Sequence, residues 1–299
     1  MLFRLSPAVV HGVVWPNLIF WFGNAILLCI YKTQPSWLEQ FRLSSVWPWQ
    51  GDEQVRDRTH DRHLALIHCS SVQRQAQWKE LMKKTILQVL FNQLVLALPL
   101  GYFTYDAAVA MGYSHSLEKF PSLLSVAVQI VAFMVIEDTI FYWSHRTLHH
   151  PRIYKYIHKQ HHEYQDAVIG ISAEYAHWLE FIIGNAIPFT AGPVLTGAHA
   201  IVWIVWALVR IGETLDSHSG YDVPWSPFRL IPFSGSSGHH DFHHSHVVGN
   251  YGTFFLWWDA ICGTDSAYCK FLDKYGHVTD ARFQQQRDRV TQKRLGKAE

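Results

Sequence analysis

Histidines gather in three short stretches of this chain, "HRTLHH" (145–150), "HKQHH" (158–162) and "HDFHH" (240–244). Positions i, i+3 and i+4 of a helix share one face, so the last two stretches each predict three imidazoles on one side. Neutral imidazole binds iron, zinc, copper and nickel. Eight or nine imidazoles are too many for one ion with about four to six positions. The pattern therefore predicts two ions, each with an open position.

The predicted metal ligands come from these stretches and from the polar segment "DSHSGYD", and they are His145, His149, His158, His161, His162, His218, His240, His243 and His244. A metal-bound histidine usually gives its second N–H to a carboxylate or carbonyl. A further set of residues is therefore assigned to the metal or to the groups that orient its ligands: His150, His177, His239, Glu137, Asp138, Glu174, Asp216 and Asp241. His150 precedes Pro151 and competes with His149 as the ligand. The alternative, unrelated surface or core histidines, does not explain the matched spacing.

Four apolar regions position these stretches: Val9 to Tyr31, about Ile86 to Met111, Leu123 to Trp143, and Phe181 to Ile211. The first three are each long enough to cross a bilayer core of about 30 Å. The second is broken by "PLGY", and the fourth by "PFTAGPVLTG". Two short apolar arms around a Pro/Gly break predict a shallow hairpin that enters and leaves on one side, although two full spans remain an alternative. The first region is too long for the core of a cleaved signal peptide and is expected to be a retained anchor.

Basic residues indicate the orientation of these segments. They cluster between the first two apolar regions, whereas the first eight residues carry only Arg4. By the positive-inside rule, the 32–82 loop is cytosolic. The third span then returns the chain to the cytosol, so the histidines are predicted on the cytosolic side.

Composition agrees with a membrane protein, because 49% of the 299 residues are hydrophobic and 16% are charged. The net charge of +1 gives no basic surface for nucleic acid. The four cysteines form no C-x-x-C pair, which argues against zinc-thiolate and disulfide chemistry. We expect an all-α integral membrane helical bundle with a cytosolic, histidine-rich di-metal cap. Its parts are an anchor region with the basic loop (1–120), the site domain (121–275) and a charged cytosolic tail (276–299).

The motifs "SHRTLHH", "HKQHHEY" and "HHDFHH" resemble the histidine boxes of the fatty acid hydroxylase/sterol desaturase superfamily. Three longer stretches are similar to the C-4 methylsterol oxidases: "ISAEYAHWLE", "ETLDSHSGYDVPWSPFRLIPF" and "HHDFHHSHVVGNYGTFFLWWDAICGTD". The resemblance covers roughly residues 125 to 268. It makes residues 121–275 the catalytic domain of a membrane monooxygenase, with no catalytic residue expected beyond the metal ligands.

The resemblance also implies cofactors and partners. It implies a di-iron centre that uses O2, with electrons from NAD(P)H through cytochrome b5 and its reductase. It implies stepwise oxidation of a sterol C-4 methyl group to alcohol, aldehyde and carboxylate, in the endoplasmic reticulum membrane beside other enzymes of sterol C-4 demethylation. Zinc is expected as a substitute in purified protein, because it binds nitrogen ligands more tightly than iron(II).

Other functions share the same ligands. Within the superfamily they are sterol C-5 desaturation, sterol 25-hydroxylation, and oxidation of fatty-acyl chains, alkanes or aldehydes. A different class is a non-catalytic membrane metal protein such as a transporter. A transporter places its ligands at bilayer depth, whereas these histidines follow the end of an apolar segment.

Overall fold

The computed structural model describes residues 10–276 except 45–46, 48, 50–70 and 166. The predicted tail (276–299) and the central part of the basic loop therefore lie almost wholly outside the described residues. Within the described ranges the chain is helical and contains no β-strand, apart from an isolated bridge between Arg42 and Tyr221. This confirms the all-α prediction.

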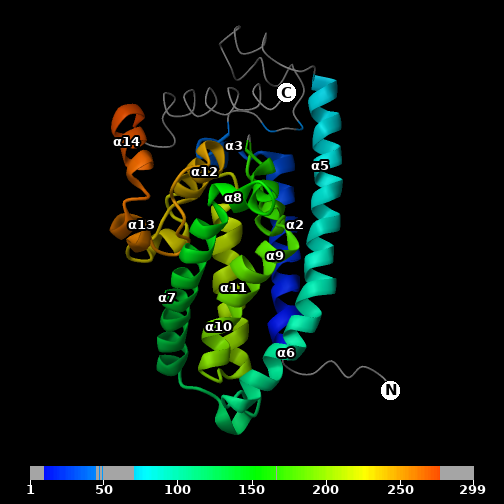
Figure 1. The fold of residues 1–299 in the computed structure, drawn as a ribbon, viewed down its shortest axis with the longest axis vertical. Helices are drawn as coiled ribbons and strands as arrows, with labels where there is room; N and C mark the ends of the chain where they lie inside the picture. Colours follow the sequence, from blue (N-terminus) through cyan, green and yellow to red (C-terminus); the bar gives the residue numbers. More distant parts are fainter. Residues whose placement is uncertain (1–9, 45–46, 48, 50–70, 166, 277–299) are drawn as a thin grey trace.

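Long helices form an elongated bundle (Figure 1). They are α2 (Trp15–Thr33), α5 (Ser71–Phe91), α6 (Ala97–Ala110), α7 (Leu123–Leu148), α10 (Ile187–Leu195) and α11 (Ala200–Ser217). Four stretches are long and apolar enough to cross a membrane: Val10–Thr33, Gln75–Ala110, Leu123–Leu148 and Trp178–Leu195. The chain is thus a membrane helical bundle, and each predicted apolar region overlaps one of these stretches.

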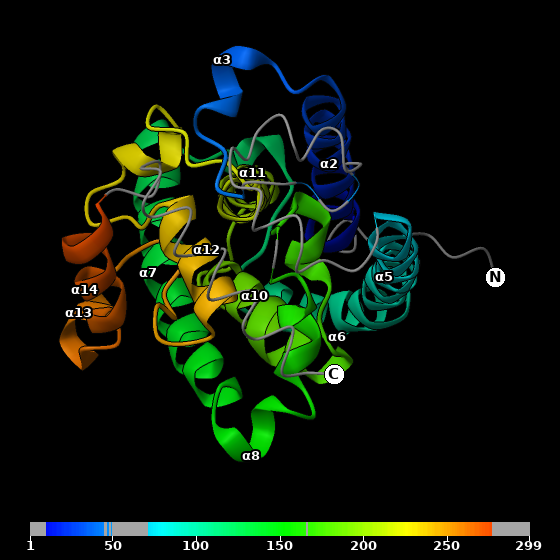
Figure 2. The same cartoon turned by 90° about the horizontal axis from the view of Figure 1, so that it is seen from above.

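Short helices cover one end of the bundle, where α12 lies across the ends of α7 and α11 (Figures 1 and 2). The α-helices of this set are α3 (Ser36–Glu39), α8 (Pro151–Tyr154), α9 (Trp178–Glu180), α12 (Ser237–His246), α13 (Trp257–Cys262) and α14 (Ser266–Tyr275). The 3₁₀-helices there are η5 (His158–Glu163), η6 (Gly170–Glu174) and η8 (Pro227–Leu230). Remaining turns are π-helical η1 (Val10–Val14), η3 (Asn92–Leu96) and η7 (Phe181–Ala186), and 3₁₀-helical η4 (Leu117–Lys119).

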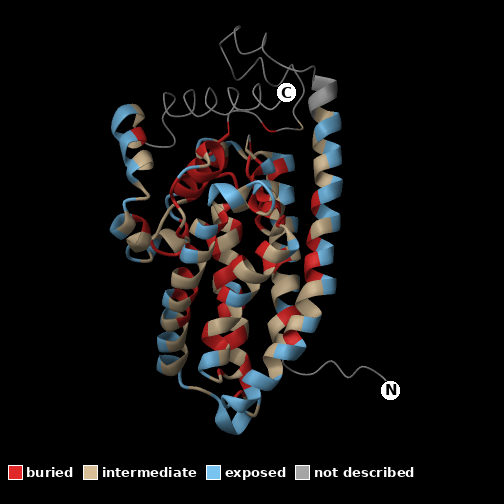
Figure 3. Ribbon diagram, viewed as in Figure 1, coloured by how far each residue is buried: buried red, intermediate tan, exposed pale blue. Residues whose placement is uncertain are grey.

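Helix α7 is apolar outside and polar inside. Its outer face exposes Leu123, Leu124 and Val128, whereas Glu137 and Asp138 are fully buried. This reverses the pattern of a helix in water and fits a helix whose outer face meets lipid. Figure 3 shows buried residues concentrated at the histidine-bearing end, with exposed residues along the outer faces of the long helices. The polar interior of α7 therefore leads into the histidine cluster.

The predicted break at "PLGY" does not occur. α5 starts at Ser71, before the apolar region, and α6 continues through Pro99 and Gly101 to Ala110. The π-helical turn η3 directly precedes this stretch. Proline lacks the N–H that an α-helix would use at that position. A π turn shifts the hydrogen-bonding pattern there, so the helix passes the proline without ending.

The fourth apolar region forms a hairpin of α10 and α11, but α10 continues through Pro188, Gly192 and Pro193 of the predicted break and the chain turns only after Leu195. The hairpin is therefore not shallow. Its tip reaches the loop between α6 and α7 at the far end of the bundle, where Ala200 N donates to Ser114 O at 2.8 Å. Gly197 has φ +56°, and a Cβ there would lie 2.0 Å from Met111 O. Only glycine fits this close approach without a backbone shift. The ends of the hairpin opposite its tip still lie near the three histidine stretches.

The segment after α2 packs beside the residues that follow α11. Leu43 N donates to Gly220 O at 2.9 Å, and Tyr31 Oη donates to Ser219 O at 3.0 Å. Trp47 is fully buried in the same aromatic cluster. The start of the basic loop therefore lies at the histidine end of the bundle.

Candidate metal centre

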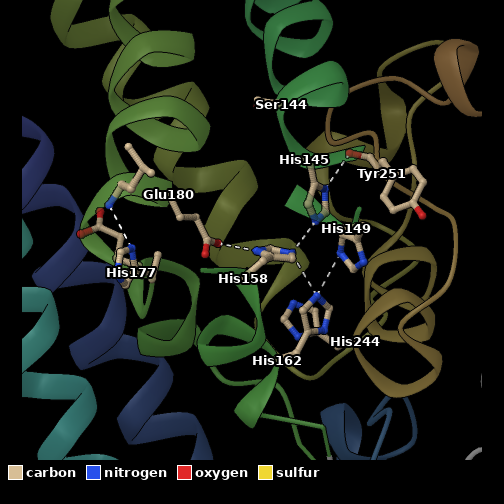
Figure 4. A network of polar contacts seen from close by, with 12 residues as sticks. Ser144, His145, His149, His158, His162, His177, Glu180, His244 and Tyr251 are labelled. Carbon is tan, nitrogen blue, oxygen red and sulfur yellow. Dashed lines mark hydrogen bonds and ion pairs between the residues drawn. The ribbon is translucent and has the colours of Figure 1, made fainter. Parts of the chain in front are cut away.

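Five imidazoles converge where α7 ends. His145 lies in the last turn of α7 and His149 follows that turn, whereas His158 and His162 come from η5 and His243 from α12. One ring nitrogen of each lies within 4.8 Å of those of the other four. Figure 4 shows four of them turned toward one point. We call this set the first histidine group.

A second histidine group lies beside the first. It contains His161 from η5, His218 directly after α11, and His240 and His244 from α12, all buried. Their ligand atoms also lie within 4.8 Å of one another. The His161 and His244 ring centroids are 4.7 Å apart. The structure thus brings together all nine histidines predicted as ligands, in groups of five and four.

Each H-x-x-H-H stretch contributes to both groups, which its spacing does not reveal. In both stretches the histidines at i and i+4 join the same group and the histidine at i+3 joins the other, whether the segment is 3₁₀-helical (η5) or α-helical (α12). His158 and His162 belong to the first group and His161 to the second. α12 is α-helical, but His243 points into the first group and its neighbours His240 and His244 into the second. The prediction of one shared face was therefore incomplete.

Hydrogen bonds define the tautomer of four of these rings. In each, Nδ1 lies close to an oxygen that only accepts: His145 to Tyr251 O at 3.0 Å, His158 to Glu180 Oε1 at 2.8 Å, His218 to Thr214 O at 2.9 Å and His243 to Gly249 O at 2.6 Å. Nδ1 must therefore carry the proton and donate it. In a neutral imidazole the other nitrogen, Nε2, then presents a lone pair.

Two of these lone pairs, on His145 and His158, face each other, which a cation would resolve. His145 Nε2 and His158 Nε2 are 3.1 Å apart, yet neither carries a proton to share. Three further Nε2–Nε2 pairs in the first group lie at 3.1 or 3.2 Å, namely His149–His243, His149–His162 and His158–His162. In the second group His218–His240 and His240–His244 are both 3.1 Å apart. An all-nitrogen donor set of this kind suits a transition-metal ion.

Burial keeps these rings in the neutral form that binds metal. Burial, and then the neighbouring imidazoles, hold the pKa values of His158, His162 and His243 well below the usual range. Burial lowers the pKa of His218 to about 3. A protonated imidazole cannot bind a metal, so the site is ready to bind one at neutral pH.

A cavity of about 50 Å³ adjoins both groups. Its lining includes His145, His158 and His161, together with other residues of α7, η7 and α11. At roughly 10–15 Å³ for each water-sized group, the cavity holds a few heavy atoms. It can therefore admit the reacting end of a lipid next to the histidines.

Comparisons with known proteins agree with this arrangement. A family model for "Fatty acid hydroxylase" matches residues 130–264, a range that contains all nine histidines. Methylsterol monooxygenase 1 of Rattus norvegicus is 44% identical over 201 residues, which are 67% of this chain and 66% of that protein. The Danio rerio protein of the same name is 41% identical over 206 residues, 69% of this chain and 67% of that protein.

The chain belongs to the fatty acid hydroxylase family. The family also contains a relative with another name, the very-long-chain aldehyde decarbonylase GL1-8 of Oryza sativa subsp. indica, which is 36% identical over 211 residues, 69% of this chain and 77% of that protein. The alignment to the rat protein leaves about a third of that protein uncovered. No solved structure matches the chain.

In this member of the fatty acid hydroxylase family, the carboxylates predicted to orient the ligands have other partners. Arg210 Nε donates to Glu137 Oε1 at 2.6 Å, and Asp138 Oδ1 accepts from Phe255 N at 3.1 Å. Among the described residues, no hydrogen bond or ion pair joins either carboxylate to a histidine. Both join α7 to other elements, because a carboxylate buried in a bundle needs a charged or N–H partner.

Most of the remaining assigned residues also lie outside the two groups. His150 is exposed and its Nδ1 accepts from Arg152 N at 3.3 Å at the start of α8, so His149 rather than His150 faces the first group. His177 Nδ1 likewise accepts from Leu179 N at the start of α9. The others are placed as follows: Glu174 accepts from Gln93, Asp216 lines the cavity, and His239 and Asp241 are buried on α12.

Glu180 is the residue of the site that sequence reasoning missed. Its carboxylate holds the His158 ring (Figure 4). The sequence signal was an acidic residue at the start of an apolar segment, where a charge is costly unless it has a function. The carbonyls of Tyr251 and Gly249 carry no such signal, because any residue supplies a backbone oxygen. Gly249 has φ +61°, and a Cβ there would lie 1.9 Å from Thr264 O.

Proposed function

We propose that this protein oxidises the C-4 methyl group of 4,4-dimethyl and 4-methyl sterols, using O2 and two iron ions held by the two histidine groups. The products are, in order, an alcohol, an aldehyde and a carboxylate. The observation that carries the proposal is the similarity to methylsterol monooxygenases in a family whose model spans all nine histidines. Two buried groups of neutral imidazoles support the use of two ions.

The reaction explains why a metal is needed. An unactivated methyl C–H has no acidic proton and no leaving group, so side-chain acids and bases cannot attack it. Iron bound to the histidines supplies the oxidising chemistry. The chain itself supplies three things: it holds the imidazoles neutral and aligned through their Nδ1 hydrogen bonds, it excludes bulk water from the buried cavity, and it holds one methyl group close to the ligands.

We further propose that the protein lies in the endoplasmic reticulum membrane with the histidine groups on the cytosolic side. The basic loop begins at the histidine end of the bundle, and the positive-inside rule puts such loops in the cytosol. Electrons from NAD(P)H would then arrive from cytochrome b5 and its reductase at that face. The apolar outer surface of α7 supports delivery of a sterol from the bilayer.

Sterol profiling of cells that lack the protein tests this proposal. We expect 4,4-dimethyl sterols to accumulate and to disappear when the wild-type chain is restored, whereas a His158→Ala chain should not restore the profile. Unchanged 4,4-dimethyl sterols with a rise in long-chain aldehydes would instead support the aldehyde chemistry named for the rice relative. Metal analysis of the purified protein separately tests for two iron ions, with zinc as the expected contaminant.

A further inference from the structure

Glu180 has one carboxylate oxygen engaged and one unused. It lies at the start of the fourth apolar stretch and is only 4% exposed. Oε1 accepts from His158 Nδ1 at 2.8 Å (Figure 4), but the buried Oε2 has no hydrogen-bond partner. Leaving a buried carboxylate oxygen unpaired costs free energy. A ligand that donates a hydrogen bond there would remove that cost.

Holding His158 does not require a carboxylate. The Nδ1 atoms of His145, His218 and His243 are each held by a backbone carbonyl. Glu180 is the exception, with a carboxyl side chain that brings a second oxygen, Oε2, into a buried place. The second oxygen therefore needs an explanation of its own.

The cavity beside the histidine groups puts Glu180 next to the reacting position. Its lining includes Glu180 together with His145 and His158. Two other carboxylates of the described chain line it, Glu213 and Asp216, but neither has a buried oxygen without a hydrogen-bond partner, as Glu180 has. Glu180 is thus the lining carboxylate with an acceptor to spare.

The wall around Glu180 is apolar and leaves room. Phe141, Leu148 and Ala173 line the cavity there, and so does Gly184. A Cβ on Gly184 would lie 3.7 Å from Leu148 Cδ1 and 3.8 Å from Glu180 Cγ. Glycine therefore keeps open the space between an apolar wall and the carboxylate. Such a space suits a hydrocarbon that carries one hydroxyl group.

We propose that Glu180 Oε2 accepts a hydrogen bond from the substrate hydroxyl on the carbon next to the one whose methyl group is oxidised. This rests on the proposed function: in a sterol, the C-3 hydroxyl is the neighbour of C-4. One carboxylate then fixes both the His158 ring and the substrate, and it brings the C-4 methyl to the histidine groups. The substrate class follows: the site takes lipids with a free hydroxyl beside the oxidised position and rejects those with a carbonyl there.

A Glu180→Gln variant separates this role from the holding of His158. The amide oxygen can still accept from His158 Nδ1, so its NH2 group would face the cavity as a donor. A 3-ketone accepts a hydrogen bond but cannot donate one. The variant should therefore lose its preference for the 3-hydroxyl sterol and gain affinity for the matched 3-ketone.

The measurement is equilibrium binding of radiolabelled 4,4-dimethyl sterol and its 3-keto counterpart to full-length protein in lipid nanodiscs, without reductant so that no turnover occurs. We expect the wild type to bind the hydroxyl sterol about tenfold or more tightly than the ketone, because the ketone would leave the buried Oε2 unpaired. Glu180→Gln should bring the ratio of the affinities for the hydroxyl sterol and the ketone to one or invert it. The matched control Glu118→Gln makes the same chemical change at an exposed site and should leave the ratio unchanged.

Equal weakening of both sterols in Glu180→Gln would overturn the proposal and leave Glu180 as a positioning residue for His158 alone. An unchanged ratio of the two sterol affinities would overturn the proposal too, since a bound water would then be the partner of Oε2.

Gly184→Ala gives a second test that keeps the Glu180–His158 hydrogen bond. The added methyl group should overpack the cavity and weaken binding of the hydroxyl sterol at least about fivefold, while the amount of bound metal stays unchanged. Unaltered affinity for the sterol would mean that the sterol binds elsewhere.

Failure of the proposed function has a different signature. If the wild type binds neither sterol and forms no C-4 oxidised product, the sterol assignment fails and the role of Glu180 falls with it. If the wild type oxidises the hydroxyl sterol while Glu180→Gln leaves its discrimination intact, the role of Glu180 alone is refuted.

Discussion

Removing the guanidinium of Arg210 should destabilise the protein more than removing either of its carboxylate partners. Arg210 is buried between α7 and α11, with Nε 2.6 Å from Glu137 Oε1 and Nη1 3.2 Å from Glu213 Oε2. Nη1 also contacts Thr214 Oγ1. Arg210→Met therefore leaves two carboxylates buried without their cation. Loss of one partner of a buried ion pair costs about 3–5 kcal/mol.

Glu137→Gln should cost less, because its amide oxygen still accepts from Arg210 Nε and Glu213 still balances the charge. We expect this change to lower the free energy of unfolding by about 1–2 kcal/mol. At roughly 2 °C for each kcal/mol in a chain of this size, Arg210→Met should lower Tm by about 6–10 °C and Glu137→Gln by about 2–4 °C. The free energy of unfolding lost in the double variant should be smaller than the sum of the two single losses by about 0.5–3 kcal/mol, because Arg210 and Glu137 are in contact.

Thermal unfolding of the detergent-solubilised protein, followed by size-exclusion chromatography with fluorescence detection, measures these shifts. Arg152→Met is the matched control, because Arg152 is exposed on α8 and should change Tm by less than about 1 °C. If Arg210→Met behaved like Arg152→Met, or if the double variant were additive, the ion-pair network would not hold α7 to α11.

Three further outcomes are expected. His149→Ala should lower the amount of bound metal measured by mass spectrometry, whereas His150→Ala should not, since only His149 lies in the first histidine group. Equal losses of metal in the two variants would contradict that placement. The His218 ring has a pKa of about 3 in the folded chain and about 6.5 in the unfolded chain, so it contributes stability above pH 6.5 that is lost as pH falls toward 3. Buried carboxyls act in the opposite direction, since burial raises the pKa of Glu174 to about 7. The change in Tm of the chelator-treated protein between pH 7.5 and 5.5 should therefore be less destabilising in His218→Gln than in the wild type, and equal changes would refute the buried neutral state of His218. The topology can be tested with a membrane-impermeant thiol reagent in a background without native cysteines, since Tyr156 and Leu117 are both exposed. Tyr156→Cys, at the histidine end, should react with reagent added from the cytosol, and Leu117→Cys, at the far end, only with reagent added from the lumen. The reverse pattern would invert the proposed topology.

Much of this protein follows from local sequence pattern. Long apolar segments predict membrane helices because a bilayer requires about 20 such residues to cross it, and the four candidate spans overlap the predicted regions. The density and spacing of the histidines predict a metal centre because few other roles use so many imidazoles at matched spacing. The Pro/Gly stretch 188–197 predicts a hairpin, but its prolines do not mark the turn: Pro188 and Pro193 lie within α10, and the chain reverses only after Leu195.

Other features depend on residues that are distant in the chain. The sequence cannot show that one histidine stretch serves two groups, because the division depends on which rings of η5, α12 and the end of α7 meet in the folded protein. Helix continuity through Pro99 depends on a π turn rather than on composition. Glu137 and Asp138 look like partners for histidines along the chain, yet Arg210 and the backbone at Phe255 take them. The orientation of the ligands is decided by Glu180 and by backbone carbonyls, which only the tertiary structure brings to the rings.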